Sequence, residues 1–222
     1  MAINTEAYQS ISKELQTKNV TLVAVSKTKP VADIQALYDL GHREFGENYV
    51  QELVDKETVL PKDIRWHFIG HLQSNKVKYI APFVHLIHGV DSFNLLKEIN
   101  KQAAKNNRII DCLLQVHIAE EETKFGFDEK ELDVLMRACA DVQMKNINIL
   151  GLMGMASFSD DMEKVRGEFK KLKVLFDQCS QSSIVNDHWS VLSMGMSADY
   201  RIAIEEGSTM VRIGSLLFGA RG

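Results

Sequence analysis

Apolar runs and amphipathic stretches alternate along the chain. The first run covers residues 20–25, where unbroken aliphatic and β-branched side chains are typical of a strand covered on both faces. Similar runs predict further strands over 43–45, 66–69, 84–90, 109–118, 147–153, 189–192 and 210–213. Polar or glycine-containing residues follow these runs, so we expect a helix or a turn after each strand.

Helical spacing of apolar residues fills the stretches between the strands. It predicts helices over 5–17, 31–40, 131–142 and 198–206, others that begin near Tyr49, Ser74 and Ser92, and one that runs through Phe169. Eight strands with intervening helices or turns match an α/β fold of the (β/α)8 TIM-barrel type better than an open doubly wound sheet. No linker or repeat is visible, so we expect one domain over residues 1–222.

The composition is that of an ordinary globular protein. The 222 residues, 45% hydrophobic and 25% charged, suffice for one core, and the net charge of -4 gives no electrostatic reason to bind nucleic acid or an anionic membrane. No apolar run reaches the ~20 residues of a membrane span, and the start lacks a signal-peptide pattern. Three separated cysteines without a CxxC motif argue against disulfides and structural zinc, so we expect a cytoplasmic protein.

Lys27 follows the first predicted strand directly. Side chains alternate along a strand, so Val23, Val25 and Lys27 share one face. If that face is the barrel interior, the amine lies at the barrel mouth, where burial favours the neutral form that attacks aldehydes. The alternative is that Lys27 only begins a solvated loop.

Two glycine-containing loops are candidates for binding an anion. In barrels of this type phosphate is often held after the seventh and eighth strands. Ser193, Gly195 and Ser197 follow the seventh predicted strand, with a glycine that permits close approach of a ligand and a serine placed to cap a helix, and Gly214 and Ser215 follow the eighth. Each loop alone is explained by ordinary turn chemistry. Together with an amine across the mouth they favour a ligand that carries an aldehyde and a phosphate, such as pyridoxal 5'-phosphate (PLP).

Arg212 shares a strand face with Met210 and is expected to lie beneath that ligand. Its guanidinium would donate to the pyridine nitrogen and oppose protonation of the ring, which makes the cofactor a poorer electron sink. The alternative is a structural arginine that is paired within the barrel.

Weaker candidates lie at other strand ends. Asn48 is placed to reach the ring or to serve as a turn residue, and Met153 is placed to pack on the ring or in the core. His67 and His71 have the i, i+4 spacing of a helical zinc pair but lie in a predicted strand and turn, so we expect no metal site. Lys29 belongs to the same mouth, where simple solvation is the plain expectation.

Several motifs together resemble the pyridoxal phosphate homeostasis protein family, the YggS/PROSC-type proteins. They span most of the chain, and their combination is specific: LVAVSKTKP at 22–30, FGENYVQE at 45–52, WHFIGHLQSNK at 66–76 and SMGMSADYRIAIEEGSTMVRIGSLLFGAR at 193–221. Two departures from the family lie away from these motifs: a short segment before the first strand, and Ala156, Ser157 and Phe158 where relatives often have prolines.

The resemblance implies the barrel of the alanine racemase amino-terminal domain. It implies that Lys27 forms the Schiff base with PLP, that residues 193–197 with Gly214 and Ser215 bind the phosphate, and that Arg212 lies near the pyridine nitrogen. Lys124 looks like a second family lysine that accepts cofactor.

Three functions compete on these residues. The first is a monomeric, non-catalytic carrier that buffers PLP and delivers it transiently to apo enzymes. The second is a racemase or decarboxylase; a racemase needs an opposing base, yet the sequence ends nine residues after Ile213 and its last tyrosine is Tyr200. The third is a Schiff-base aldolase, whose proton-transfer residue would be drawn from His67, His71, His117 and Glu47. We predict the carrier.

Overall fold

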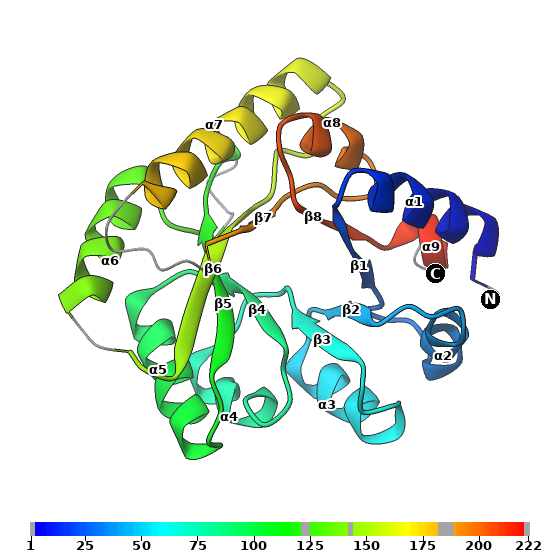
Figure 1. Ribbon diagram of the computed structural model, residues 1–222, viewed down its shortest axis with the longest axis horizontal. Helices are drawn as coiled ribbons and strands as arrows, with labels where there is room; N and C mark the ends of the chain where they lie inside the picture. Colours follow the sequence, from blue (N-terminus) through cyan, green and yellow to red (C-terminus); the bar gives the residue numbers. More distant parts are fainter. Residues whose placement is uncertain (1–2, 121–124, 142–143, 182–188, 220–222) are drawn as a thin grey trace.

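Eight parallel strands close into a barrel in the computed structural model, which describes residues 3–120, 125–141, 144–181 and 189–219. Neighbouring strands in sequence are neighbours in the barrel, and the last pairs with the first (Figure 1). The predicted TIM-barrel architecture is thereby confirmed. The strands are β1 (Thr21–Val25), β2 (Glu44–Glu47), β3 (Arg65–Phe68), β4 (Leu86–Val90), β5 (Ile110–Val116), β6 (Ile147–Gly154), β7 (Val191–Ser193) and β8 (Met210–Ile213).

Helices surround the ring of strands (Figure 1). They are α1 (Thr5–Thr17), α2 (Val31–Asp39), α3 (Val50–Val59), the 3-10 turn η1 (Ser74–Lys76), α4 (Val77–Ile80), α5 (Phe93–Lys105), α6 (Glu129–Asp141), α7 (Met162–Ser180), α8 (Tyr200–Glu205) and α9 (Ser215–Phe218). Polar side chains begin several of them: Asn4, Ser92 and Asp161 each accept hydrogen bonds from first-turn N–H groups. Within the described ranges, no helix has the length and apolar character needed to cross a membrane.

Alternation along the strands separates two apolar layers. Residues that point outward, such as Phe45, Trp66 and Phe68, join the large cluster between the strands and the helices. Inside the barrel a small cluster consists of Val23, Leu86, Leu113, Met153 and Met210. Val23 is in register with Arg212 across the β1–β8 pair, so both side chains point into the barrel, as the alternation predicts.

Three element boundaries differ from the predictions in ways that affect the site. β2 extends to Glu47, so Gly46 and Glu47 are strand residues rather than a turn. β7 includes Ser193, which therefore ends a strand instead of starting a loop. The four-residue helix α9 begins directly after Gly214 and was not predicted, because so short a helix shows no periodicity.

Candidate functional site

A cavity of about 500 Å³ opens at the carboxyl ends of the strands. Six of the nine predicted site residues line it: Lys27, Asn48, Ser197, Arg212, Gly214 and Ser215. They come from the ends of β1, β2, β7 and β8, so segments distant in sequence meet in one place. Met155 and Ile69 add apolar walls that the sequence did not reveal; alternation from Met153 along β6 was the only available signal for Met155.

The loop that carries Lys27 is anchored by a buried polar cluster. Ser26 is fully buried and its hydroxyl donates to Glu47 Oε1 at 2.6 Å. The ammonium of Lys56, on α3, donates to the same oxygen at 2.7 Å and to the carbonyl oxygen of Ser26 at 2.8 Å. Burial raises the pKa of Glu47, and the Lys56 charge opposes part of that shift. The backbone immediately before Lys27 is therefore fixed from the helix layer.

The backbone after Lys27 is fixed as well. The Thr28 N–H donates to Glu52 Oε1 at 2.6 Å, and the same carboxylate oxygen accepts from Lys56. Thr28 adopts φ +63°, a left-handed conformation that costs a β-branched residue roughly 1–3 kcal/mol. The loop keeps this conformation because contacts on both sides of Lys27 hold it there.

Arg212 is buried and paired within the barrel, as the second alternative expects, and it also lines the cavity. Its Nη1 donates to the carbonyl oxygen of Ser193 at 2.9 Å and to Ser193 Oγ at 2.6 Å, and its Nη2 donates to the Gly154 carbonyl at 3.0 Å. Burial lowers the pKa of Arg212 to about 10, and the nearby charge of Asp199 opposes that shift. A guanidinium has five N–H donors, so two have no bond within the described chain.

The two loops predicted to bind phosphate lie against each other. Ser197 Oγ accepts a hydrogen bond from the Gly214 N–H at 3.2 Å, and this bond joins the β7 and β8 loops. The prediction that Ser197 caps a helix is wrong: Asp199 precedes α8, and its carboxylate accepts from the Met196 N–H instead. Among the described residues the N–H groups of Ser197, Ala198 and Ser215 have no acceptor, although all three residues line the cavity.

The other three predicted site residues do not line the cavity. Met153 lies in the apolar cluster inside the barrel, and Ser193 is fully buried beneath Arg212. Gly195 has φ +95°, and a Cβ there would lie 2.6 Å from the Ala203 Cβ. Its close approach is thus to α8 rather than to a ligand.

The end of β2 contains two unsatisfied buried acceptors. Glu47 Oε2 and Asn48 Oδ1 have no hydrogen-bond partner in the part of the chain that is described. Asn48 lines the cavity, whereas Glu47 points toward α3, as expected for consecutive residues of an extended segment. An unpaired buried amide oxygen at a cavity wall marks a position for a polar ligand or water.

The remaining candidate residues are dispersed. His67 is buried inside the barrel, whereas exposed His71 pairs with Asp91 at 2.8 Å, so the two do not face a common ligand. The Lys29 amine donates to the carbonyls of Phe218 and Gly219 at 3.0 and 3.2 Å and also lines the cavity. Lys124 lies outside the described residues, so its role stays a prediction.

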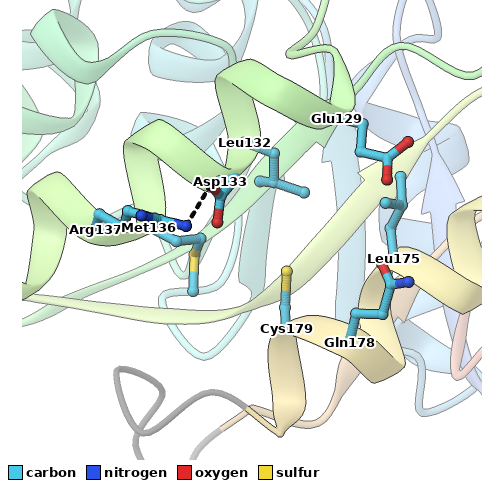
Figure 2. Close-up of a pocket in the computed structure, with 8 residues that line it drawn as sticks. All are labelled: Glu129, Leu132, Asp133, Met136, Arg137, Leu175, Gln178 and Cys179. Carbon is cyan, nitrogen blue, oxygen red and sulfur yellow. Dashed lines mark ion pairs between the residues drawn. The ribbon is translucent and has the colours of Figure 1, made fainter.

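A second hollow, of about 580 Å³, lies between α6 and α7. Figure 2 shows its lining side chains, among them Leu132, Met136, Leu175 and Cys179, and the ion pair between Arg137 and Asp133. No backbone N–H cradle or buried cation is among the described groups at its walls. The barrel mouth is therefore the candidate site that we consider further.

Fold and site define a class: a (β/α)8 barrel with a lysine and an arginine at its mouth and backbone donors on the adjoining loops. The family model for the alanine racemase N-terminal domain matches residues 3–222. The pyridoxal phosphate homeostasis protein of Aquifex aeolicus is 44% identical over 202 residues, which is 90% of this chain and 86% of that protein. The Escherichia coli K12 protein of the same name is 38% identical over 92% of this chain and 87% of that protein.

Solved structures agree with this assignment. PipY of Synechococcus elongatus PCC7942, solved with PLP bound, is 33% identical with a TM-score of 0.87, covering 96% of this chain and 99% of PipY. Alanine racemase of Bartonella henselae, at 17% identity and a TM-score of 0.69, shares the fold, and the match covers 97% of this chain and 59% of that enzyme. The chain belongs to the alanine racemase N-terminal domain family and, within it, to the pyridoxal phosphate homeostasis proteins. The resemblance in the sequence motifs is confirmed.

Proposed function

We propose that the chain binds PLP covalently at Lys27, buffers it and delivers it to apo enzymes, and does not turn over amino acids. One observation carries this proposal: one cavity collects an amine, a buried guanidinium and backbone N–H groups that have no acceptor among the described residues. PLP has a matching group for each of them, namely an aldehyde, a pyridine nitrogen and a phosphate. The names of the relatives and the PLP in PipY support the same ligand.

The residues present fit this ligand. The N–H groups of Ser197, Ala198 and Ser215 would donate to the phosphate, Arg212 would donate one of its remaining N–H groups to the ring nitrogen, and Met155 would pack on the ring. When bound, PLP supplies an aldehyde that amines attack, and a carrier has to hold and pass on that group. Lys27 would hold it, and the hydrogen bonds on both sides of this residue fix the backbone from which its side chain extends into the cavity wall.

The cavity is poorly equipped for catalysis on amino acids. No histidine, cysteine or tyrosine is among the described residues that line it, and the Lys29 amine is tied to the Phe218 and Gly219 carbonyls. The candidates for an aldolase base lie elsewhere: His67 is inside the barrel, and Glu47 pairs with Lys56. An arginine at the ring nitrogen further disfavours carbanion stabilisation.

We also propose that the working unit is a monomeric single domain in the cytoplasm. All the proposed site groups come from one chain, and the three cysteines are free thiols, as a reducing compartment allows. Size-exclusion chromatography with light scattering measures the molar mass in solution, which should be that of a monomer.

Transfer of the cofactor tests the carrier function. Loaded protein, freed of unbound PLP by gel filtration, is mixed with the apo form of a PLP-dependent enzyme, and we expect the activity of that enzyme to be restored. Lys27→Ala protein that has passed through the same loading and filtration is the control and should restore nothing. If loaded wild-type protein restores no more activity than buffer does, delivery is not its function.

A further inference from the structure

A continuous line of polar side chains crosses the barrel interior beneath the cavity. It starts at Arg212 near the carboxyl ends of the strands, continues through Ser193 and His88, and reaches His67 and Glu44 at the amino end. The successive distances are 2.6, 3.1, 2.9 and 2.7 Å. Ser193, His88 and His67 are at most 1% exposed, so water cannot replace these bonds.

The direction of the bonds can be deduced from the partners of Ser193. Its Oγ accepts from Arg212, since a guanidinium only donates. The other hydrogen-bond partner of that oxygen among the described residues is His88 Nδ1. A buried hydroxyl proton needs an acceptor, so it points to His88 Nδ1, and this nitrogen carries no proton.

The remaining bonds follow from the chemistry of imidazole. Burial lowers the pKa of His88 well below its usual value, and the neighbouring positive groups act in the same direction. A neutral His88 with a bare Nδ1 carries its proton on Nε2 and donates it to His67 Nδ1. His67 then donates from its own Nε2 to the Glu44 carboxylate, which can only accept.

Arg212 is a buried cation whose hydrogen-bond partners are all neutral: the Ser193 hydroxyl and two carbonyl oxygens. This chain of hydrogen bonds therefore has a cation at one end and a carboxylate at the other, and every hydrogen bond in it is polarised in the same direction. Glu44 has its own surface partner in Arg65, which lies outside the line.

We propose that Glu44, His67 and His88 are positioning residues for the cofactor: as a one-way hydrogen-bond chain, they hold Ser193 as an acceptor and so fix the guanidinium of Arg212 toward the bound ring. This inference rests on the proposed function for the role of Arg212, while the direction of the chain is a property of the apo protein. Glu44 thus acts on the site from the opposite end of the barrel.

A metal ion is the competing explanation for the lower end. One ligand atom from each of Glu44, His67 and His85 lies within 4.8 Å of the others, and a cation held there would take the place of the proton on His67 Nε2. That would place the remaining His67 proton on Nδ1 and reverse the donor–acceptor direction of the hydrogen bonds between His67, His88 and Ser193. The 2.7 Å contact between His67 Nε2 and Glu44 and the pairing of Glu44 with Arg65 favour the proton.

Long-range 1H–15N correlation spectra of apo protein, prepared with and without EDTA at neutral pH, test the direction without any cofactor. We expect the Nε2–H tautomer at both His88 and His67, whether or not EDTA is present. An Nδ1–H tautomer at His88, or a doubly protonated His67, would overturn the proposal. A reversal that EDTA abolishes would assign the lower end to a metal instead.

A variant pair tests the coupling to the cofactor. Glu44→Leu removes the terminal acceptor, and we expect mixed tautomers at His88, PLP binding weakened about tenfold and a changed pH dependence of the bound-cofactor absorbance. Arg65→Met removes the other partner of Glu44 and leaves the chain complete, so it should match wild type in all three. If Glu44→Leu keeps both the tautomers and the PLP affinity of wild-type protein, the coupling is refuted. If wild-type protein itself does not bind PLP, the proposed function is refuted.

Discussion

The barrel-mouth cavity and the groove between α6 and α7 have similar volumes, about 500 and 580 Å³, and very different walls. The groove is lined by apolar side chains, by Glu129 and Gln178, and by the exposed Arg137–Asp133 pair, whose charges neutralise each other (Figure 2). The mouth contains a buried arginine whose hydrogen-bond partners are neutral, and backbone donors that find no acceptor in the described part of the chain. Size therefore does not identify the site; polar groups that the fold leaves unsatisfied do.

The barrel mouth also contains features that are unfavourable for folding, whereas the groove, as far as it is described, does not. A β-branched residue in a left-handed conformation and the buried Lys56–Glu47 pair are tolerated beside Lys27. Such features persist where function requires them, because better-packed alternatives are usually at least as stable. The groove shows no comparable strain among its described residues.

The largest expected difference between the two regions is covalent binding. Borohydride reduction of loaded protein followed by peptide mass mapping should place the adduct on Lys27, and Lys27→Ala should remove it completely. Gln178→Ala in the groove is the matched change and should leave the adduct intact. An adduct found on Lys29 or Lys124 in place of Lys27 would contradict the site.

The backbone donors that we propose for the phosphate predict the next largest effect. Hydrogen bonds to a charged group contribute about 1.5–3 kcal/mol each, so pyridoxal, which lacks the phosphate, should bind orders of magnitude more weakly than PLP. Absorbance titrations of both compounds measure this ratio. Similar dissociation constants would show that the β7 and β8 loops do not hold the phosphate.

The buried cluster beneath Lys27 predicts a large effect on stability. Lys56→Met leaves Glu47 buried without its cation, which should lower the free energy of unfolding by roughly 3–5 kcal/mol. Lys173→Met breaks an i, i+4 pair with Asp177 on α7 and should cost about 0.5 kcal/mol or less. Urea denaturation followed by circular dichroism measures the free energy of unfolding of both variants. Equal decreases would mean that the buried cluster contributes no more to stability than a surface ion pair.

The smallest effect concerns the nucleophile of the groove. Burial raises the pKa of the Cys179 thiol to about 11, so little thiolate is present at neutral pH. Alkylation of Cys179 by iodoacetamide at pH 8 should be roughly a hundredfold slower than for a free cysteine, and should accelerate as the pH rises toward that value. Fast labelling at pH 8 would make the groove a reactive site after all.

Local patterns in the sequence predict the barrel and part of its mouth. The unbroken run before Lys27 gives β1, and alternation from Val23 and Met210 places Lys27 and Arg212 on the inner face. These inferences succeed because each depends on residues close together in the chain.

Contacts between distant residues could not be predicted in the same way. The bond between His88 and Ser193 joins positions 105 residues apart, and no spacing rule connects them. The sequence predicts that Ser197 caps a helix, but its hydroxyl oxygen accepts a hydrogen bond from the N–H of Gly214, 17 residues further along the chain. The anchoring of Lys27 by Lys56 depends on how α3 packs on β2, which periodicity does not specify.

Hydrogen exchange at the α-carbon of amino acids tests the central claim most directly. Loaded protein is incubated with L-alanine in deuterium oxide, with Lys27→Ala protein as the control, and incorporation is followed by proton NMR. The account predicts no exchange beyond that of free PLP, because an arginine at the ring nitrogen would disfavour the carbanion that exchange requires. Exchange that depends on Lys27 and proceeds at enzymatic rates, on the order of 1 per second or faster, would contradict a carrier and define an enzyme.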